Sequence, residues 1–395
     1  MSELSEKLLS RTSKPACVPA LLAFEDGTVM RGNSCGAAGE VFGEICFNTS
    51  MEGYLEVITD PSYAGQIVTM TYPQIGNYGV CRNDVQAQHP ALRGLVVHDM
   101  CYTPSNFRSD QTLVQYLVEQ GVVAIEGIDT RALVCKIREA GAMRAGISTT
   151  CLDADALVER VQSSEPLVGV NLVQTVSTPA KLQRAHNTGR FNVLAIDCGA
   201  KESIMSSLEA AGCNVELAPW DISANEVFSA SPDGVFISNG PGDPDAVDAT
   251  CNTVEQILGR VPVFGICMGH QLIARAAGAR IEKLKFGHHG GNHPVKDLST
   301  GRVEITVQNH GFGIVFESLG EPVADVSVPT VDNPKFGRIE LSHVNLNDAT
   351  PEGIRFLDIP AFSVQYHPEA SPGPQDSWYL FGRFAQLMEA FHAQA

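Results

Sequence analysis

A cysteine between two glycines is the residue of this sequence whose surroundings best suit covalent chemistry. The segment 261–271 reads VPVFGICMGHQ, so an apolar run leads directly into Gly265-x-Cys267-x-Gly269 and the start of a helix. This is the layout of a nucleophile elbow with Cys in place of Ser: the glycines permit a strained turn, and the helix N-terminus favours the thiolate. The alternative is a buried apolar cysteine at a strand end. The glycines and the strand-to-helix context favour the nucleophile.

A histidine near the C-terminus is the candidate base for this nucleophile. The segment 364–374 reads VQYHPEASPGP, in which His367 follows an apolar run and Pro368 prevents a helix from continuing. Glu369 is placed where its carboxylate could hold the imidazole nitrogen that does not face sulfur. The alternative is a surface histidine beside an unrelated glutamate. Because each group follows a predicted strand, we expect a Cys267–His367–Glu369 triad.

A glycine-rich turn precedes the elbow and is a candidate oxyanion site. The apolar run GVFI leads into 238–244, which reads SNGPGDP. Gly240 and Gly242 leave backbone N–H groups free to point into a cleft, as a tetrahedral oxyanion requires. An ordinary turn would also use these residue types. The position of the segment at the end of the strand before the elbow favours the oxyanion interpretation.

Metal and nucleotide chemistry have weaker support. The segment HHGGNH contains His288, His289 and His293, but no cysteine accompanies them and the glycines indicate a hairpin. There is no GxGxxG segment linked to a strand and no GxxxxGK[ST] segment. We therefore expect neither a metal site nor nucleotide chemistry in this chain.

The elements that must position these residues form a repeating pattern in the second half of the chain. Short apolar strands alternate with amphipathic helices, which indicates parallel pairing in an open α/β sheet. The predicted strands are 192–196, 214–219, 234–238 and 261–266, and the predicted helices are 201–211, 222–229, 246–259 and 269–277. After Gly278, the alternating segments RIEKLKF, RVEITVQ and AFSVQY predict a mixed or antiparallel extension. Residues 378–394 read as a closing helix.

The first half has a different character. The segments ALLAF, EICFN, QIVTMTY and LRGLVVHD read as strands, with helices near 110–120 and 130–140. We expect a frayed start, a β-rich domain at 18–163, a linker at 164–190 and a second domain at 191–394.

Composition restricts the partners and the compartment. The 395 residues include 27 Lys and Arg and 45 Asp and Glu, for a net charge of −18. Such a surface repels phosphate backbones and anionic headgroups, so we expect neither a nucleic-acid partner nor a membrane partner. No apolar run reaches the ~18 residues of a membrane-spanning helix. The 11 cysteines form no CxxC pair, which fits reduced thiols in the cytoplasm.

The three motifs GICMGHQ, SNGPGDP and YHPEASPGP, in this order, resemble those of the class I (triad) glutamine amidotransferases. That family hydrolyses the side-chain amide of glutamine and passes on ammonia. The segments FNTSMEGYLEVITDPSYAGQIV, TYPQIGNYG, GIDTRAL, FGHHGGNHPVKD and QNHGF are similar to those of the small, glutamine-hydrolysing subunits of carbamoyl phosphate synthetases. The implied fold class is α/β: an open, mostly parallel C-terminal sheet of the class I amidotransferase type, with a β-rich N-terminal α/β domain.

Carried over by position, the resemblance implies Cys267 as the nucleophile that forms a γ-glutamyl thioester, His367 as base and then acid, and Glu369 as its orienting group. The implied glutamine-binding residues are Ser50, Gly240, Gly242, Met268, Gln271, Asn309, Gly311 and Phe312. Two departures from the family stand out. Met268 occupies a position where the family often has Leu, which a backbone N–H tolerates. The interval between Asn309 and His367 is long, so 319–352 is predicted to form an extended loop or added hairpin.

The resemblance also implies partners. Ammonia would pass to a separate large subunit that uses ATP, Mg and bicarbonate to make carbamoyl phosphate for arginine or pyrimidine biosynthesis, with no cofactor in this chain and with heterodimers in a higher assembly. One alternative is an amidotransferase subunit of another synthase, such as those for anthranilate or GMP, and the N-terminal segments argue against it. Another is a non-catalytic scaffold of the same fold, and the intact triad residues argue against that.

Overall fold

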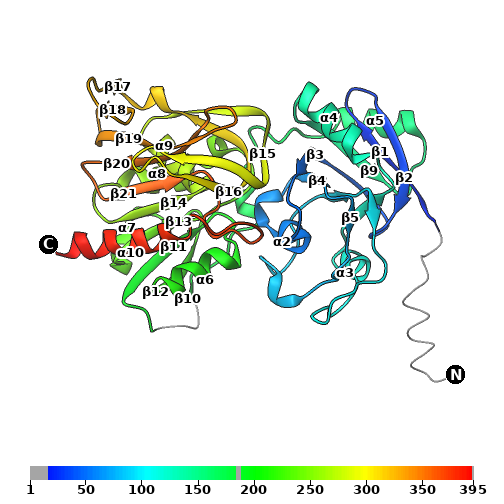
Figure 1. Ribbon diagram of the computed structural model, residues 1–395, viewed down its shortest axis with the longest axis horizontal. Coiled ribbons are helices and arrows are strands. Elements are labelled where there is room, and N and C mark those ends of the chain that lie inside the picture. The colour runs from blue at the N-terminus through cyan, green and yellow to red at the C-terminus, as the bar shows by residue number, and fades with distance from the viewer. Residues whose placement is uncertain (1–16, 184–187, 394–395) are drawn as a thin grey trace. The chain divides into compact units, whose positions relative to one another are not determined.

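The computed structural model describes residues 17–183 and 188–393 of the chain. The chain forms two compact units that divide between Leu167 and Val168 (Figure 1). The predicted linker, 164–190, spans this division. Residues 1–16 of the predicted frayed start and the last predicted helical residue, Gln394, lie outside the described residues.

The first unit is built around a closed barrel with the strand order β1-β2-β8-β6-β4-β3-β9. Its strands are β1 (Pro19–Phe24), β2 (Val29–Ser34), β3 (Glu40–Asn48), β4 (Gln66–Met70), β6 (Gly94–Val96), β8 (Val123–Glu126) and β9 (Met143–Ser148). Strands β3, β4, β6 and β8 pair in parallel, and the other pairs are antiparallel. Closure leaves the sheet without a free edge. The β-rich character is confirmed, whereas the closure is a finding of the structure.

Helices surround this barrel. They are α2 (Tyr54–Thr59), α3 (Leu113–Glu119), α4 (Thr130–Ala140) and α5 (Ala154–Gln162), and a separate pair of short strands is β5 (Gln74–Ile75) and β7 (Asp99–Met100). Helix α3 begins with a capping box between Thr112 and Gln115, which satisfies backbone N–H groups that the helix itself leaves free. Helices α3 and α4 confirm the two helices predicted in this half.

The second unit contains one large sheet, whose central strands β12, β11, β13, β14 and β21 run parallel in that order. These strands are β11 (Phe191–Asp197), β12 (Cys213–Pro219), β13 (Gly234–Ile237), β14 (Val263–Ile266) and β21 (Ala361–Val364). The helices are α6 (Glu202–Ala210), α7 (Ala224–Ala230), α8 (Asp248–Ile257), α9 (Met268–Ala276) and α10 (Tyr379–His392). The predicted strand–helix repeats are confirmed. Among the described residues, no helix is both long and apolar enough to span a membrane.

Helices cover both faces of these parallel strands. Successive side chains of a strand point to opposite faces of the sheet. On one face, Leu194 and Ile196 of β11 pack in a core with α7, α8 and α9. On the other face, Val193 and Ala195 pack in a second core with α6 and α10. Strands buried on both faces in this way read as continuous apolar runs, as they do in this sequence. In open α/β sheets, ligands bind beyond the carboxyl ends of the strands, which is where the motif residues lie.

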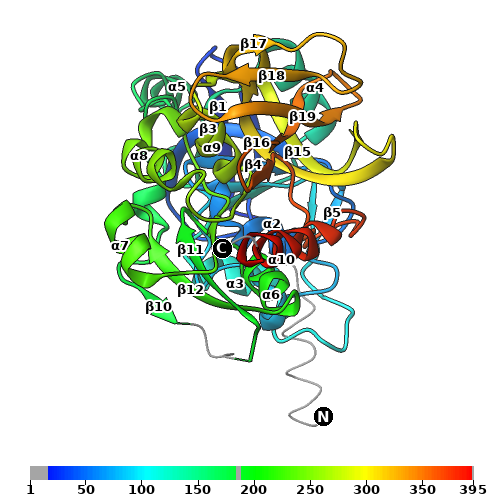
Figure 2. The same cartoon turned by 90° about the vertical axis from the view of Figure 1, so that its left-hand side faces the viewer.

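An antiparallel extension continues the sheet beyond β21. It contains β20 (Pro351–Phe356), β19 (Gly337–Asn345), β15 (Arg280–Asp297) and β16 (Val303–Val315), and β15 and β16 form the long hairpin in yellow in Figure 2. Strands β17 (Glu321–Pro322) and β18 (Thr330–Asn333) pair beside β19, and β10 (Leu182–Gln183) pairs antiparallel to β12. The predicted extension and the hairpin within 319–352 are both present.

Candidate active site

Cys267 lies at a sharp turn between β14 and α9. Its backbone has φ 54° and ψ −105°, a conformation that residues with a side chain rarely adopt. The flanking glycines are required by close approach: a Cβ on Gly269 would lie 2.2 Å from the carbonyl oxygen of Ile237, in the adjacent strand β13. A Cβ on Gly265 would lie 2.6 Å from the side chain of Ile273. The strained strand-to-helix turn that the sequence predicts is therefore present.

Neighbouring parallel strands bring the motif residues to one edge of the sheet. Strands β13, β14 and β21 are consecutive in the sheet, and Gly240, Cys267 and His367 follow their respective carboxyl ends. Strand β16 joins them there. The His367 N–H donates to the Val307 carbonyl at 2.8 Å, and the Cys267 thiol donates to the Asn309 carbonyl at 3.5 Å.

His367 and Glu369 form a buried pair. Imidazole Nδ1 lies 2.7 Å from Glu369 Oε1, and both side chains are almost completely buried. Burial alone would lower the pKa of His367, but the Glu369 carboxylate and the Cys267 sulfur outweigh burial and raise it to about 10. Nε2, the other ring nitrogen, has no hydrogen-bond partner among the described residues, so it is available to the sulfur. An imidazole with a free ring nitrogen beside a thiol is the arrangement that nucleophilic catalysis by cysteine requires.

Lys201 completes this pair, and the sequence did not suggest it. Its Nζ lies 2.8 Å from Glu369 Oε1 and donates to the carbonyls of Ala370 and Ser371 at 3.0 Å each. Burial alone would raise the pKa of Glu369, but Lys201 and His367 outweigh burial and lower it to about 2. Lys201 lies four residues after the end of β11 and immediately before α6, so its place near the carboxyl end of a predicted strand was the one signal in the sequence.

Removing this buried lysine should have a pH-dependent cost. We expect Lys201→Met to lower the free energy of unfolding at pH 7 by about 3–5 kcal/mol, since the buried Glu369 carboxylate loses one of its two cationic partners. The pKa of Glu369 is about 2 in the native state and 4.5 in the unfolded chain. Ionisation of Glu369 therefore stabilises the native state fully at pH values above 4.5. That stabilisation disappears as the pH falls through the native pKa. The difference between variant and parent should therefore shrink on acidification from about pH 5 to about pH 3, as urea unfolding would measure.

Lys181→Met is a matched control for this prediction. Lys181 is exposed and lies 3.6 Å from Glu216, so its removal should change the free energy of unfolding by less than about 0.5 kcal/mol. A Lys201→Met protein as stable as the parent would contradict the assignment. So would a difference in stability that stays constant over the whole pH range.

The other predicted residues of the second unit lie on the same elements. Gln271, one helical turn after Cys267, donates from Nε2 to the Phe312 carbonyl at 2.8 Å. Met268 is the first residue of α9, where backbone N–H groups lack helical partners. Gly240 is required by close packing, since a Cβ there would lie 2.3 Å from the Cys198 carbonyl oxygen. Gly311 borders open space, since a Cβ there would meet no heavy atom within 4 Å. Gly242 has φ 88°, a conformation that favours glycine.

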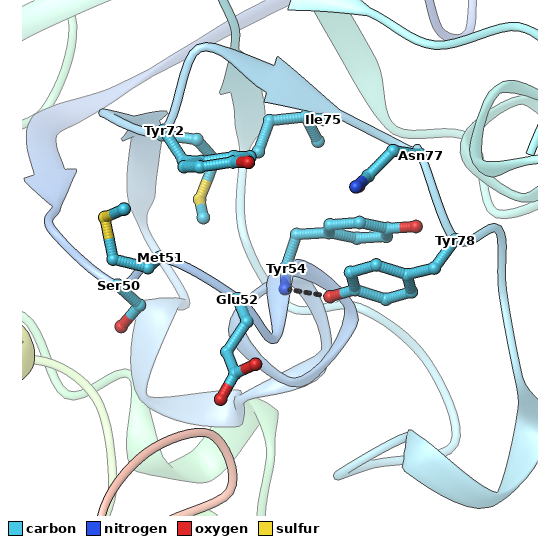
Figure 3. A pocket seen from close by; sticks show the side chains of 9 residues that line it. Ser50, Met51, Glu52, Tyr54, Tyr72, Ile75, Asn77 and Tyr78 are labelled. Carbon is cyan, nitrogen blue, oxygen red and sulfur yellow. Dashed lines mark hydrogen bonds between the residues drawn. The ribbon is translucent and has the colours of Figure 1, made fainter. Parts of the chain in front are cut away.

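Ser50 belongs to the first unit, where it lines a pocket of about 230 Å³ (Figure 3). Its hydroxyl has no hydrogen-bond partner among the described residues. On the far side of the pocket, the rings of Tyr54 and Tyr78 stack with centroids 4.0 Å apart, and the Tyr78 hydroxyl accepts the Tyr54 N–H at 2.9 Å. Glu52 and Asn77 also line the pocket, so acidic and neutral polar residues contribute to its wall.

The predicted histidine segment folds into β15. His289 Nδ1 lies 3.0 Å from Asn309 Oδ1. His288, His310 and Glu352 place one potential ligand atom each within 4.8 Å of one another and could hold a metal ion. Several of their polar atoms have other contacts: His288 Nε2 lies 2.8 Å from Asp348, and both ring nitrogens of His310 are within hydrogen-bond distance of oxygen atoms. His288 Nδ1 and Glu352 Oε2 are buried without a hydrogen-bond partner among the described residues. The absence of a metal site stays a prediction.

Comparison with known proteins supplies an independent view of the whole chain. Residues 22–147 match the family model described as carbamoyl-phosphate synthase small chain, CPSase domain, and residues 194–387 match that of glutamine amidotransferase class-I. The chain is 49% identical over 383 residues to the carbamoyl phosphate synthase small chain of Syntrophotalea carbinolica, covering 94% of this chain and 98% of that protein. It is 47% identical over 386 residues to the protein of that description from Thermotoga maritima, with the same coverage.

Proposed function

Because the chain belongs to the carbamoyl phosphate synthase small chain family, we propose that it hydrolyses glutamine to glutamate and ammonia and supplies that ammonia to a large synthetase subunit. The observation that carries the proposal is the alignment of Cys267, His367, Glu369 and Lys201 along the carboxyl edge of the parallel strands. A buried ionised carboxylate that holds an imidazole cationic beside a thiol is suited to nucleophilic catalysis.

In the proposed reaction, the Cys267 thiolate attacks the side-chain carbonyl carbon of glutamine. Backbone N–H groups at Met268 and in the Gly240–Gly242 turn stabilise the resulting oxyanion. As the C–N bond breaks, His367 gives its proton to the departing ammonia, which leaves a γ-glutamyl thioester. His367 then takes a proton from water, which attacks the thioester and releases glutamate. Glu369 fixes the imidazole, and Lys201 keeps that carboxylate ionised.

We assign glutamine recognition to the residues that the family resemblance implies: Ser50, Gly240, Gly242, Met268, Gln271, Asn309, Gly311 and Phe312. Three features support the assignment: the unpartnered hydroxyl of Ser50, the contact of Asn309 with the thiol, and the hydrogen bond from Gln271 to Phe312.

The partner carries the rest of the chemistry in this proposal. The large subunit uses ATP, Mg and bicarbonate to make carbamoyl phosphate for arginine or pyrimidine biosynthesis in the cytoplasm, while this chain works without a cofactor. Heterodimers of the two subunits join in a higher assembly. Ammonia released into water at neutral pH would be protonated and could not attack, so a sheltered path between the subunits is part of the proposal. The net charge of −18 is unfavourable for nucleic-acid partners.

Separating glutamine hydrolysis from ammonia use tests this division of labour. We expect a complex of the large subunit with the Cys267→Ala chain to make carbamoyl phosphate from an ammonium salt but not from glutamine. Because free ammonia is the nucleophile, the ammonium-driven rate should increase as the pH is raised toward the pKa of ammonium. Carbamoyl phosphate formation from each nitrogen source, with co-purification of the two subunits, is the measurement. A complex that assembles but cannot use ammonium would mean that this chain takes part in the synthetase chemistry itself.

A further inference from the structure

We propose that Gln365 is a positioning residue, which fixes the side-chain amide of Gln271 so that Gln271 presents only its oxygen to the substrate. The inference rests on the proposed glutaminase function. It assigns a role to a buried residue that no motif analysis singled out. Gln365 lies one residue beyond β21 and two before His367, and its side chain is fully buried.

The orientation of the Gln271 amide follows from its partners. Nε2 lies 2.8 Å from the Phe312 carbonyl oxygen, and because a backbone carbonyl only accepts, the Gln271 atom facing it must be the donor. The same nitrogen lies 3.0 Å from Gln365 Oε1. Both hydrogens of the amide are therefore used. A flipped Gln271 amide would set its oxygen against two acceptor oxygens, which is unfavourable.

The orientation of Gln365 follows from the same contact. Because the Gln271 atom that faces Gln365 is a nitrogen, the Gln365 atom that meets it must be the acceptor oxygen, Oε1. Gln365 Nε2 is buried without a hydrogen-bond partner among the described residues. Glu352 lies on the neighbouring strand β20, where its backbone carbonyl accepts the Gln365 N–H at 2.9 Å and its Oε1 accepts from the Asn345 amide at 2.9 Å.

This arrangement determines which part of glutamine Gln271 can bind. Its free oxygen requires an N–H donor, and glutamine has two: the side-chain amide, which reacts at Cys267, and the α-ammonium group. Gln271 lies one helical turn, about 5.4 Å, beyond Cys267, and its N–H donates to the Cys267 carbonyl at 3.1 Å. That spacing suits the three-bond separation between the reacting carbon and the α-carbon. Gln271 is thus expected to accept a hydrogen bond from the α-ammonium group.

The test compares glutamine with glutaramic acid, which lacks the α-ammonium group, using the purified full-length chain. We expect Gln365→Met to raise KM for glutamine about tenfold, with kcat changed by less than threefold. Hydrolysis of glutaramic acid should be unaffected, so the preference for glutamine, as a ratio of kcat/KM values, should fall about tenfold. Ser363→Ala is the matched control. Ser363 lies on β21, two residues before Gln365, and its hydroxyl hydrogen-bonds His270 at 2.9 Å, so this variant loses a buried hydrogen bond without altering the preference.

A second variant separates positioning from folding. The double variant Gln365→Glu/Glu352→Gln keeps an oxygen acceptor for Gln271 at position 365, and positions 352 and 365 together still carry one carboxylate. This double variant should therefore restore the preference for glutamine. A folded Gln365→Met chain with an unchanged preference would overturn the inference. If Gln365→Met does not fold, a folded double variant without the preference would overturn it. A wild-type chain that hydrolyses no glutamine would instead overturn the proposed function, and the inference with it.

Discussion

Replacing Cys267 by alanine is expected to reduce glutamine hydrolysis by at least about 10³-fold. Alanine has no atom that can form the thioester, and neighbouring groups cannot replace a covalent nucleophile. The fold should survive, because alanine keeps the Cβ at φ 54° and removes only one sulfur atom. Glutamate release measures activity, and thermal unfolding verifies that the variant is folded.

Cys251→Ala provides the control for this prediction. Cys251 is a buried, free cysteine on α8, in the same unit but in the core rather than at the carboxyl edge of the strands. Its removal should leave glutamine hydrolysis close to that of the parent. If Cys267→Ala hydrolysed glutamine at the parental rate, or if Cys251→Ala were the inactive variant, the nucleophile would be assigned wrongly.

Replacing His367 by asparagine is expected to lower kcat by about 10²–10⁴-fold. The amide can occupy much of the imidazole volume and hydrogen-bond Glu369, but it cannot transfer a proton to the departing ammonia. Glu369→Gln should have a smaller effect, about 10- to 100-fold, because the imidazole remains and can still adopt the reactive orientation. The two kcat values at saturating glutamine provide the comparison.

Lys201 complicates the Glu369→Gln variant, because its ammonium group would lose a buried carboxylate at 2.8 Å. The double variant Lys201→Met/Glu369→Gln removes both charges and should regain stability relative to Glu369→Gln alone. If it is folded, its kcat reports the loss of the orienting carboxylate without the burden of an unpaired charge. If His367→Asn and the double variant both had the kcat of the parent chain, His367 would not be the catalytic base.

The parts of the site that local sequence could predict are those whose geometry depends on near neighbours. The elbow at Cys267 requires glycines two residues to either side, and both close approaches that explain them are present. Glu369 reaches His367 across two residues. Strand–helix alternation likewise predicted β11 to β14 and their helices, because strands buried on both faces are short apolar runs.

Contacts between distant segments could not be predicted in this way. Lys201 and Glu369 are 168 residues apart, and only the order of strands in the sheet makes them neighbours. Gln365 and Gln271 are 94 residues apart and meet for the same reason. Closure of the first unit depends on parallel pairing of β3, β4, β6 and β8, and β6 has only 3 residues, too few for a periodic pattern. Register and strand order are properties of the folded chain rather than of any one segment.

We expect this chain to break the glutamine side-chain amide through a covalent intermediate on Cys267. The most direct test is to mix the wild-type chain with glutamine, stop the reaction in acid within a single turnover, and locate the added mass by peptide mass spectrometry. We expect one γ-glutamyl group on the peptide that contains Cys267, and none when Cys267→Ala is treated identically. Release of glutamate without any adduct on Cys267, or an adduct on another of the 11 cysteines, would contradict this expectation.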